Sequence, residues 1–135
     1  MNQSRRIVDD KQLVRAAIRA REKAYTPYSN YPVGAALLTK SGRLYTGANV
    51  ENASYGLTVC AERVAALKAV SEGDRDFEAI AVVTENGGTP CGACRQVLSE
   101  FGPNMRVIVS DTSGNSREYR IPDLIPDFFT PADLE

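Results

Sequence analysis

Apolar and polar positions follow two periods along this chain, one helical and one strand-like, and together they predict alternating helices and strands. A first helix is predicted after Asp9 or Asp10, either of which can cap it. Its helically spaced apolar stripe consists of Leu13, Val14, Ala17, Ile18 and Ala24. This helix must end before Pro27, and residues 1–8 ahead of it are predicted to form a polar arm.

Two more helices and five strands are predicted downstream. The second helix runs from about Cys60 to Glu72 with Val64, Leu67 and Val70 as its apolar residues, and the third covers residues 91–101. Strands are predicted at residues 33–39, 43–48, 79–83, 106–110 and 117–121. From the second helix onward strands and helices alternate, which implies parallel pairing with right-handed crossovers.

The connecting segments complete a single predicted domain, residues 1–135. Residues 25–32 hold three tyrosines and two prolines and are expected to form an ordered loop, whereas residues 49–58 form a polar loop. A chain of this length can bury a core without disulfides, and no repeat or linker divides it.

Composition and charge argue against nucleic-acid-binding and membrane-spanning classes of protein. The net charge is −1, so the chain lacks the basic surface expected of a nucleic-acid-binding protein. No apolar run approaches the roughly 20 residues needed to cross a bilayer. Three cysteines cannot form a disulfide framework, and their spacing suits a reducing cytosol. We therefore expect a cytoplasmic protein that interacts with neither membrane nor nucleic acid.

The three cysteines are the main candidates for chemistry, because the chain contains no histidine. Cys60, Cys91 and Cys94 are each predicted at the start of a helix, where the helix dipole lowers a thiol pKa. A closed structural zinc site needs four such ligands, so three ligands leave one position for water. Glu62 follows Cys60 closely and could serve as an acid/base group.

Simpler interpretations of these residues exist. The cysteines could be buried small apolar side chains, or Cys91 and Cys94 could form a redox pair. Glu62 could be a solvated helix glutamate. Arg63 could lie exposed, or it could donate to the thiolates and offset their charge on a zinc ion.

Two motifs give the chain a specific resemblance. Cys-Ala-Glu-Arg at 60–63 and Pro-Cys-Gly-Ala-Cys-Arg-Gln at 90–96 resemble the small cytidine deaminases of pyrimidine salvage. The likeness extends to residues 27–29, 33–38 and 47–53, the last of which contains Asn-Val-Glu-Asn-Ala. The resemblance implies a three-layer α/β/α fold, in which a mixed sheet of about five strands has helices on both faces.

The resemblance also implies roles for residues that would contact the substrate. Asn49 and Glu51 would hydrogen-bond the ribose 3′-hydroxyl, and the backbone N–H of Ala61 would help to hold the base. Tyr31 would line the pyrimidine pocket, where the family commonly has phenylalanine. The extra hydroxyl of this tyrosine needs a partner or solvent.

Members of this size are homotetramers that share their pockets, and the resemblance extends this to the present chain. Ala53 and Tyr55 would then come from a second subunit and Phe129 from a third. Either Phe128 or Phe129 could instead anchor the tail in the core. Gln96 would support Arg63 and the thiolates.

The implied reaction is hydrolytic deamination of cytidine and 2′-deoxycytidine to uridine and 2′-deoxyuridine, with release of ammonia. One zinc ion per chain, held by Cys60, Cys91 and Cys94, would activate a water molecule. Glu62 would carry protons from that water to the ring N3 and the leaving amino group. Alternatives are a nucleoside antibiotic or other heterocyclic amine as substrate, a polynucleotide substrate, which the charge disfavours, and a zinc or binding module without activity.

Overall fold

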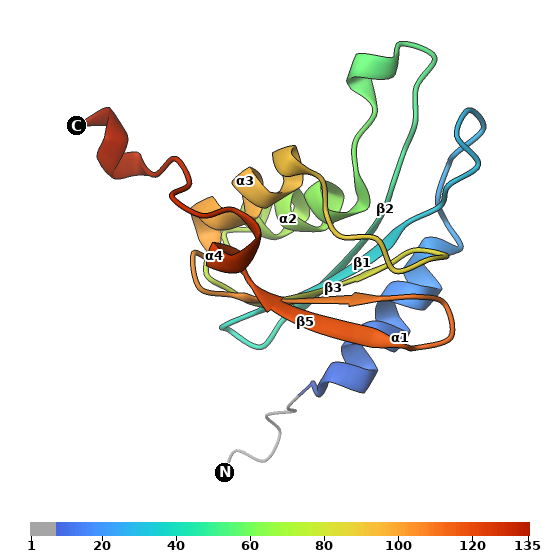
Figure 1. The fold of residues 1–135 in the computed structure, drawn as a ribbon, viewed down its shortest axis with the longest axis horizontal. Coiled ribbons are helices and arrows are strands. Elements are labelled where there is room, and N and C mark those ends of the chain that lie inside the picture. The colour runs from blue at the N-terminus through green and yellow to red at the C-terminus, as the bar shows by residue number, and fades with distance from the viewer. Residues whose placement is uncertain (1–7) are drawn as a thin grey trace.

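The computed structural model describes residues 8–135, which build a five-stranded sheet with helices on both faces (Figure 1). The predicted polar arm, apart from Val8, lies outside the described residues. The strands lie in the order β2-β1-β3-β4-β5. Their bounds are Gly34–Thr39 for β1, Leu44–Ala48 for β2, Phe77–Val83 for β3, Arg106–Ser110 for β4 and Ser116–Arg120 for β5.

The sheet is mixed, as the resemblance implied. Strand β1 pairs antiparallel with both β2 and β3, so these two neighbours run in the same direction. Strand β3 pairs parallel with β4, which confirms the expected crossover, but β5 returns antiparallel to β4. The general expectation of parallel pairing fails at β5 because residues 111–115 form only a tight turn, and a parallel crossover needs a dozen or more residues.

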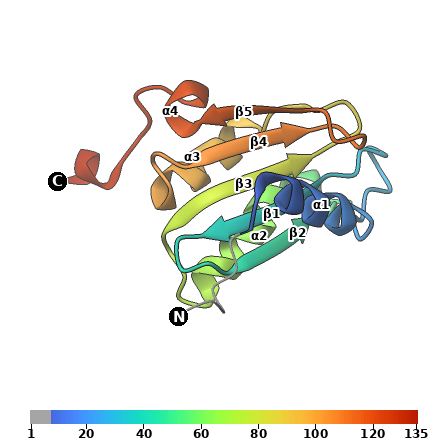
Figure 2. The ribbon, with the colours of Figure 1, turned by 90° about the horizontal axis from the view of Figure 1, so that it is seen from below.

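Helices cover the two faces unequally. Helix α1 (Asp10–Arg21) packs on one face, while α2 (Ala61–Ser71), α3 (Gly92–Phe101) and the short α4 (Ile121–Leu124) pack on the other. Figure 2 shows α1 in front of the sheet, with α2 and α3 behind it. Neighbouring residues of β1 alternate between the two cores, since Ala35 and Leu37 face α2 while Ala36 faces α1.

Helix α1 begins where the sequence indicates but ends earlier. Asp9 is the N-cap, its carboxylate accepts from the Gln12 backbone N–H at 2.8 Å, and the Gln12 side chain accepts from the Asp9 N–H at 2.9 Å. The helix ends at Arg21, so the prediction that Ala24 belongs to its apolar stripe is wrong. Leu13, Val14 and Ala17 are buried as predicted.

Helix α2 buries a different face from the predicted one. Val64 and Val70 are only partly buried and Leu67 is 52% exposed, whereas the buried apolar residues are alanines, namely Ala61, Ala65, Ala66 and Ala69. The cause is the close approach of the helix to β2 at Gly47. A Cβ at position 47 would lie 2.6 Å from the Ala61 carbonyl oxygen and 2.7 Å from the Ala65 nitrogen. Only small side chains fit at this distance.

Gly47→Ala should therefore lower the free energy of unfolding by more than about 2 kcal/mol, because the added methyl group meets helix backbone that must shift. Chemical denaturation followed by circular dichroism measures the change. Gly56→Ala is the matched control, since nothing lies within 4 Å of a Cβ at that position. Equal stability of the two variants would contradict the close packing of α2 on β2.

Candidate metal centre and the loops around it

The three cysteines converge because α2 and α3 begin at the same edge of the sheet. Each helix follows a strand, β2 or β3, and those two strands run in the same direction. Cys60 is the N-cap residue of α2 and Cys91 that of α3, while Cys94 lies in the first turn of α3 and is buried.

The distances between the sulfur atoms fit a metal ion. Cys60 Sγ lies 3.9 Å from Cys91 Sγ, which lies 3.6 Å from Cys94 Sγ. Around a tetrahedral zinc ion with Zn–S bonds of about 2.3 Å, sulfurs lie about 3.8 Å apart. Within residues 8–135 no other group of three or more acidic or cysteine ligands is so closely gathered. All three cysteines are free, so the site is not a disulfide.

Arg63 belongs to this cluster and is not an exposed helix arginine. Its Nη2 donates to Cys60 Sγ at 3.4 Å, and its Nε is the one buried side-chain nitrogen or oxygen without a partner in the described chain. A hydrogen bond from Cys94 and the nearby guanidinium lower the pKa of the Cys60 thiol to about 5. The hydrogen bond to Cys60, together with burial, raises the pKa of Cys94. The cluster thus holds a thiolate ready for a cation.

Glu62 is buried beside the sulfurs. It is only 5% exposed, which excludes a solvated helix glutamate. Burial raises the pKa of its carboxyl to about 7, and the negative charge of Cys60 contributes in the same direction. A carboxyl with this pKa can both accept and donate a proton near neutral pH.

Asn49 links two of the loops around the site. It is 8% exposed, its Oδ1 accepts from the Val33 N–H at 2.9 Å, and its Nδ2 donates to the Tyr31 carbonyl at 3.0 Å. An amide nitrogen carries two donors, so one N–H remains for a ligand. The structure thus shows a role for Asn49 in holding the loop, and its contact with a ribose stays a prediction.

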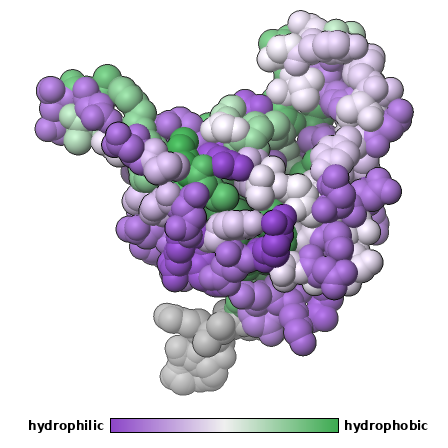
Figure 3. Space-filling view, viewed as in Figure 1, coloured by the Kyte–Doolittle hydropathy of each residue, from purple (hydrophilic) through white to green (hydrophobic). Residues whose placement is uncertain are grey.

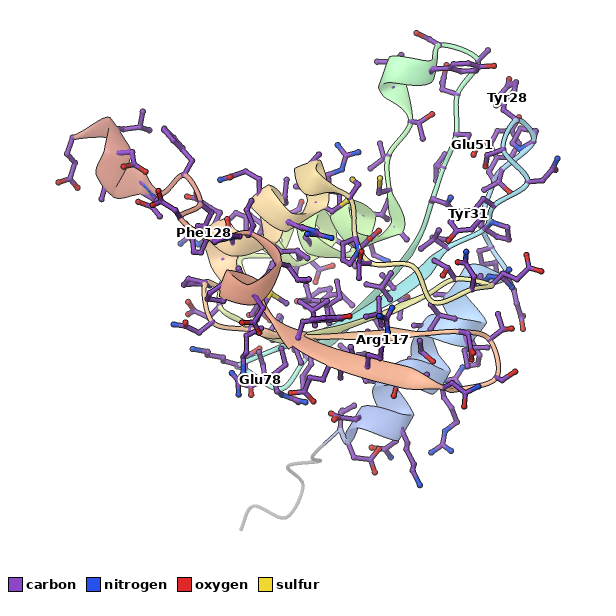
Figure 4. The ribbon with its side chains drawn as sticks, in the orientation of Figure 1. Tyr28, Tyr31, Glu51, Glu78, Arg117 and Phe128 are labelled. Carbon is purple, nitrogen blue, oxygen red and sulfur yellow. The ribbon has the colours of Figure 1, made fainter. Side chains whose placement is uncertain are left out.

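Glu51 is held by the loop opposite it. Its Oε1 accepts from the backbone N–H groups of Tyr28, at 2.9 Å, and Ser29, at 3.1 Å, and the Ser29 hydroxyl donates to its Oε2. The Ser29 hydrogen bond leads the effects that lower the pKa of Glu51. Figure 4 shows Glu51 next to Tyr28, where both residues border an open hollow of about 340 Å³. Ser29 lies in the segment at 27–29 that carries the resemblance, but no role was predicted for it.

The hydroxyl of Tyr31 has a partner that the sequence did not reveal. It donates to Asn86 Oδ1 at 2.7 Å, and the same oxygen accepts from the Thr84 hydroxyl at 3.2 Å. Thr84 in turn accepts from the Gly88 N–H at 2.8 Å. This chain of hydrogen bonds joins the loop at 25–32 to the segment at 84–90 that leads to Cys91.

The residues expected to serve neighbouring subunits lie on projecting segments. Ala53 and Tyr55, the latter 75% exposed, lie on the arm between β2 and α2 (Figure 1). Phe129 is 54% exposed on the C-terminal segment, whereas Phe128 packs against the core as the tail anchor. Figure 3 shows apolar surface over α4 and along that segment.

Gln96 has a different partner from the expected one. Its amide donates to the Phe129 carbonyl at 2.9 Å, so it holds the C-terminal segment, and no hydrogen bond joins it to Arg63 or the sulfurs in the described part of the chain. Ala61 is fully buried as the first residue of α2, where the backbone N–H has no acceptor within the helix.

Known proteins are similar to this chain in sequence and in fold. A family model described as "Cytidine and deoxycytidylate deaminase zinc-binding region" matches residues 7–110. A cytidine deaminase from Halalkalibacterium halodurans is 52% identical over 130 residues, which cover 94% of this chain and 98% of that protein. A blasticidin-S deaminase from Bacillus cereus is 32% identical over 127 residues, covering 87% of this chain and 89% of the other.

Solved structures of cytidine deaminases have folds similar to that of this chain. The crystal structure of cytidine deaminase from Burkholderia pseudomallei has a TM-score of 0.86 and 52% identity, covering 90% of this chain and 99% of that one. That of Mycobacterium tuberculosis has a TM-score of 0.77 and 44% identity, covering 91% and 98%. The three-layer arrangement inferred from the sequence is therefore confirmed.

Removal of one sulfur should empty the metal centre. Cys91→Ala leaves two ligands, so bound zinc should fall from about one ion per chain to a small fraction of that after dialysis. Elemental analysis measures the loss, and X-ray absorption of the unchanged protein should show three sulfurs and one lighter atom. Ala93→Ser, an exposed change in the same turn, is the control. Full zinc retention by Cys91→Ala would contradict the assignment.

Proposed function

This chain belongs to the cytidine and deoxycytidylate deaminase family, and on that premise we propose that it hydrolyses cytidine and 2′-deoxycytidine to the corresponding uridines and ammonia. The observation that carries the proposal is the buried carboxyl of Glu62 beside three converging sulfurs. We also propose that residues 1–135 act as one catalytic domain in the cytoplasm, where thiol ligands stay reduced.

Zinc bound by Cys60, Cys91 and Cys94 would supply a Lewis acid that lowers the pKa of water. Glu62 would accept a proton from the attacking water and deliver it to the ring N3. It would then carry the second proton of that water, from the new C4 hydroxyl, to the amino group, which leaves as ammonia while C4 becomes a carbonyl. Its pKa of about 7 suits both directions of transfer. Arg63 would hold the Cys60 sulfur in place and offset the net charge of −1 that three thiolates give a divalent ion.

The loops supply the proposed contacts to the nucleoside. Glu51 is kept ionised by Ser29 and can accept a hydrogen bond from the ribose 3′-hydroxyl, while Asn49 can donate one. Tyr31 would line the base, and the Ala61 N–H would help to hold it. Because one relative is a blasticidin-S deaminase, blasticidin S is the alternative substrate to test. The higher identity of this chain to cytidine deaminases favours cytidine.

We further propose a homotetramer with shared pockets. Outward residues of α2, including Val64 and Leu67, line an apolar groove of about 510 Å³ with Val50 and Val59. A second copy of the chain could cover this surface. The projecting arm and C-terminal segment would then bring Ala53, Tyr55 and Phe129 to the pockets of neighbouring subunits.

Purified, zinc-loaded protein should consume cytidine in an ultraviolet assay, and Glu62→Gln should abolish most of that activity. The amide keeps the size of the side chain but cannot carry a proton, so turnover should fall at least about a hundredfold while zinc content stays full. Glu100→Gln, on the exposed side of α3, is the control. If the turnover of Glu62→Gln stayed within a few-fold of that of the unchanged enzyme, Glu62 would not be the proton carrier. If the variant lost zinc, Glu62 would be a metal ligand.

Sedimentation should show an assembly of about four chains, and co-expression tests whether pockets are shared. Glu62→Gln chains and Tyr55→Ala chains should each be nearly inactive alone. Mixed tetramers should regain activity, because some pockets combine an intact Glu62 with a neighbour's intact Tyr55. Mixtures no more active than the separate variants, or a fully active monomer, would rule out the shared pocket.

A further inference from the structure

Arg95 makes three hydrogen bonds next to the metal centre. Its Nε donates to the Pro90 carbonyl at 2.7 Å, its Nη2 donates to the Thr89 hydroxyl at 3.0 Å, and its Nη1 donates to the Leu124 carbonyl at 2.6 Å. The side chain is partly buried, and none of the three acceptors is a carboxylate. Arg95 is therefore held by three directional hydrogen bonds to neutral oxygens and not by an ion pair.

The acceptors belong to two different segments of the chain, the turn before α3 and the end of α4. Thr89 and Pro90 immediately precede Cys91, while Arg95 immediately follows Cys94 on α3. The guanidinium thus ties the turn that carries one sulfur to the helix that carries the other. Through Leu124 it also ties this turn to α4 and the C-terminal segment.

The approach to this turn is held by hydrogen bonds of its own, since the Arg117 guanidinium donates to the Gly87 carbonyl at 3.0 Å. It includes Gly87, with a positive φ of 74°, and Gly88, whose N–H donates to the Thr84 hydroxyl. Glycine allows many backbone conformations, so such a segment needs outside contacts to stay in one of them. At the turn itself, the backbone N–H of Arg95 donates to the Cys91 carbonyl at 3.0 Å, and its Nε donates to the carbonyl of the preceding Pro90 at 2.7 Å.

We propose that Arg95 is a positioning residue for the metal centre, which holds the Cys91 sulfur at ligand distance from Cys94 and slows the release of zinc. The inference rests on the zinc site of the proposed function but not on deamination. Groups that hold metal ligands in place typically change metal affinity 10- to 100-fold when removed. Because Arg95 donates to backbone and hydroxyl oxygens, the positions of its several N–H groups matter. A positive charge alone would not hold the turn in place.

Zinc release from the loaded protein to a chromogenic chelator, measured without substrate, tests this. Arg95→Lys and Arg95→Gln should both release zinc at least about tenfold faster than the unchanged protein, because neither side chain can make all three bonds. Arg120→Lys and Arg120→Gln are matched controls, since Arg120 also donates to a loop carbonyl, that of Asn104, but outside the metal centre. They should release zinc at the unchanged rate.

The outcomes distinguish three roles for Arg95: positioning of the zinc ligands, an effect of its charge alone, and a contribution to overall stability alone. Normal zinc release by Arg95→Lys, with fast release by Arg95→Gln, would show that charge suffices and overturn the proposal. If both Arg95 variants had lower thermal stability but released zinc at the normal rate, Arg95 would only stabilise the fold, and the proposal would also be overturned. If these variants fail to fold, Thr89→Val removes one bond and should speed release about two- to fivefold. Unchanged release by a folded Thr89→Val would then count against the proposal.

Discussion

The common direction of strands β2 and β3 is the constraint on which the site depends. Strand β1 lies between them and runs the opposite way, so both neighbours end at the same edge of the sheet. The helices that follow these strands pack on the same face and therefore begin side by side. Cys60 and Cys91 cap those two helices, so ligands 31 positions apart in the chain reach one point.

This arrangement also sets the electrostatics of the centre. Helix N-termini favour negative charge, and the Arg63 guanidinium adds a positive charge beside Cys60. Burial works in the opposite direction at Glu62, where it disfavours the ionised carboxylate. One short segment of chain therefore holds a thiol whose pKa is lowered and a carboxyl whose pKa is raised, so that the usual order of the two groups is reversed.

Much of this could be predicted from sequence, because it depends on local signals. The cap at Asp9, the order of the elements and the three cysteines without a histidine all appear in the printed chain. The buried face of α2 could not be predicted in this way. Hydrophobicity favours burial of Val64 and Leu67, but the close approach at Gly47 requires alanines instead. Contacts between distant segments, such as Ser29 with Glu51 or Gln96 with the Phe129 carbonyl, were equally hidden.

The hydrogen bond between Tyr31 and Asn86 makes two loops interdependent. A tyrosine at position 31 brings a polar group to a place where a phenylalanine would bring none, and Asn86 satisfies it. A chimaera that took only the segment at 84–90 from a relative without this asparagine would leave the Tyr31 hydroxyl to solvent. The loop at 25–32 and the segment at 84–90 therefore exchange best as a pair, because each supplies one partner of this hydrogen bond.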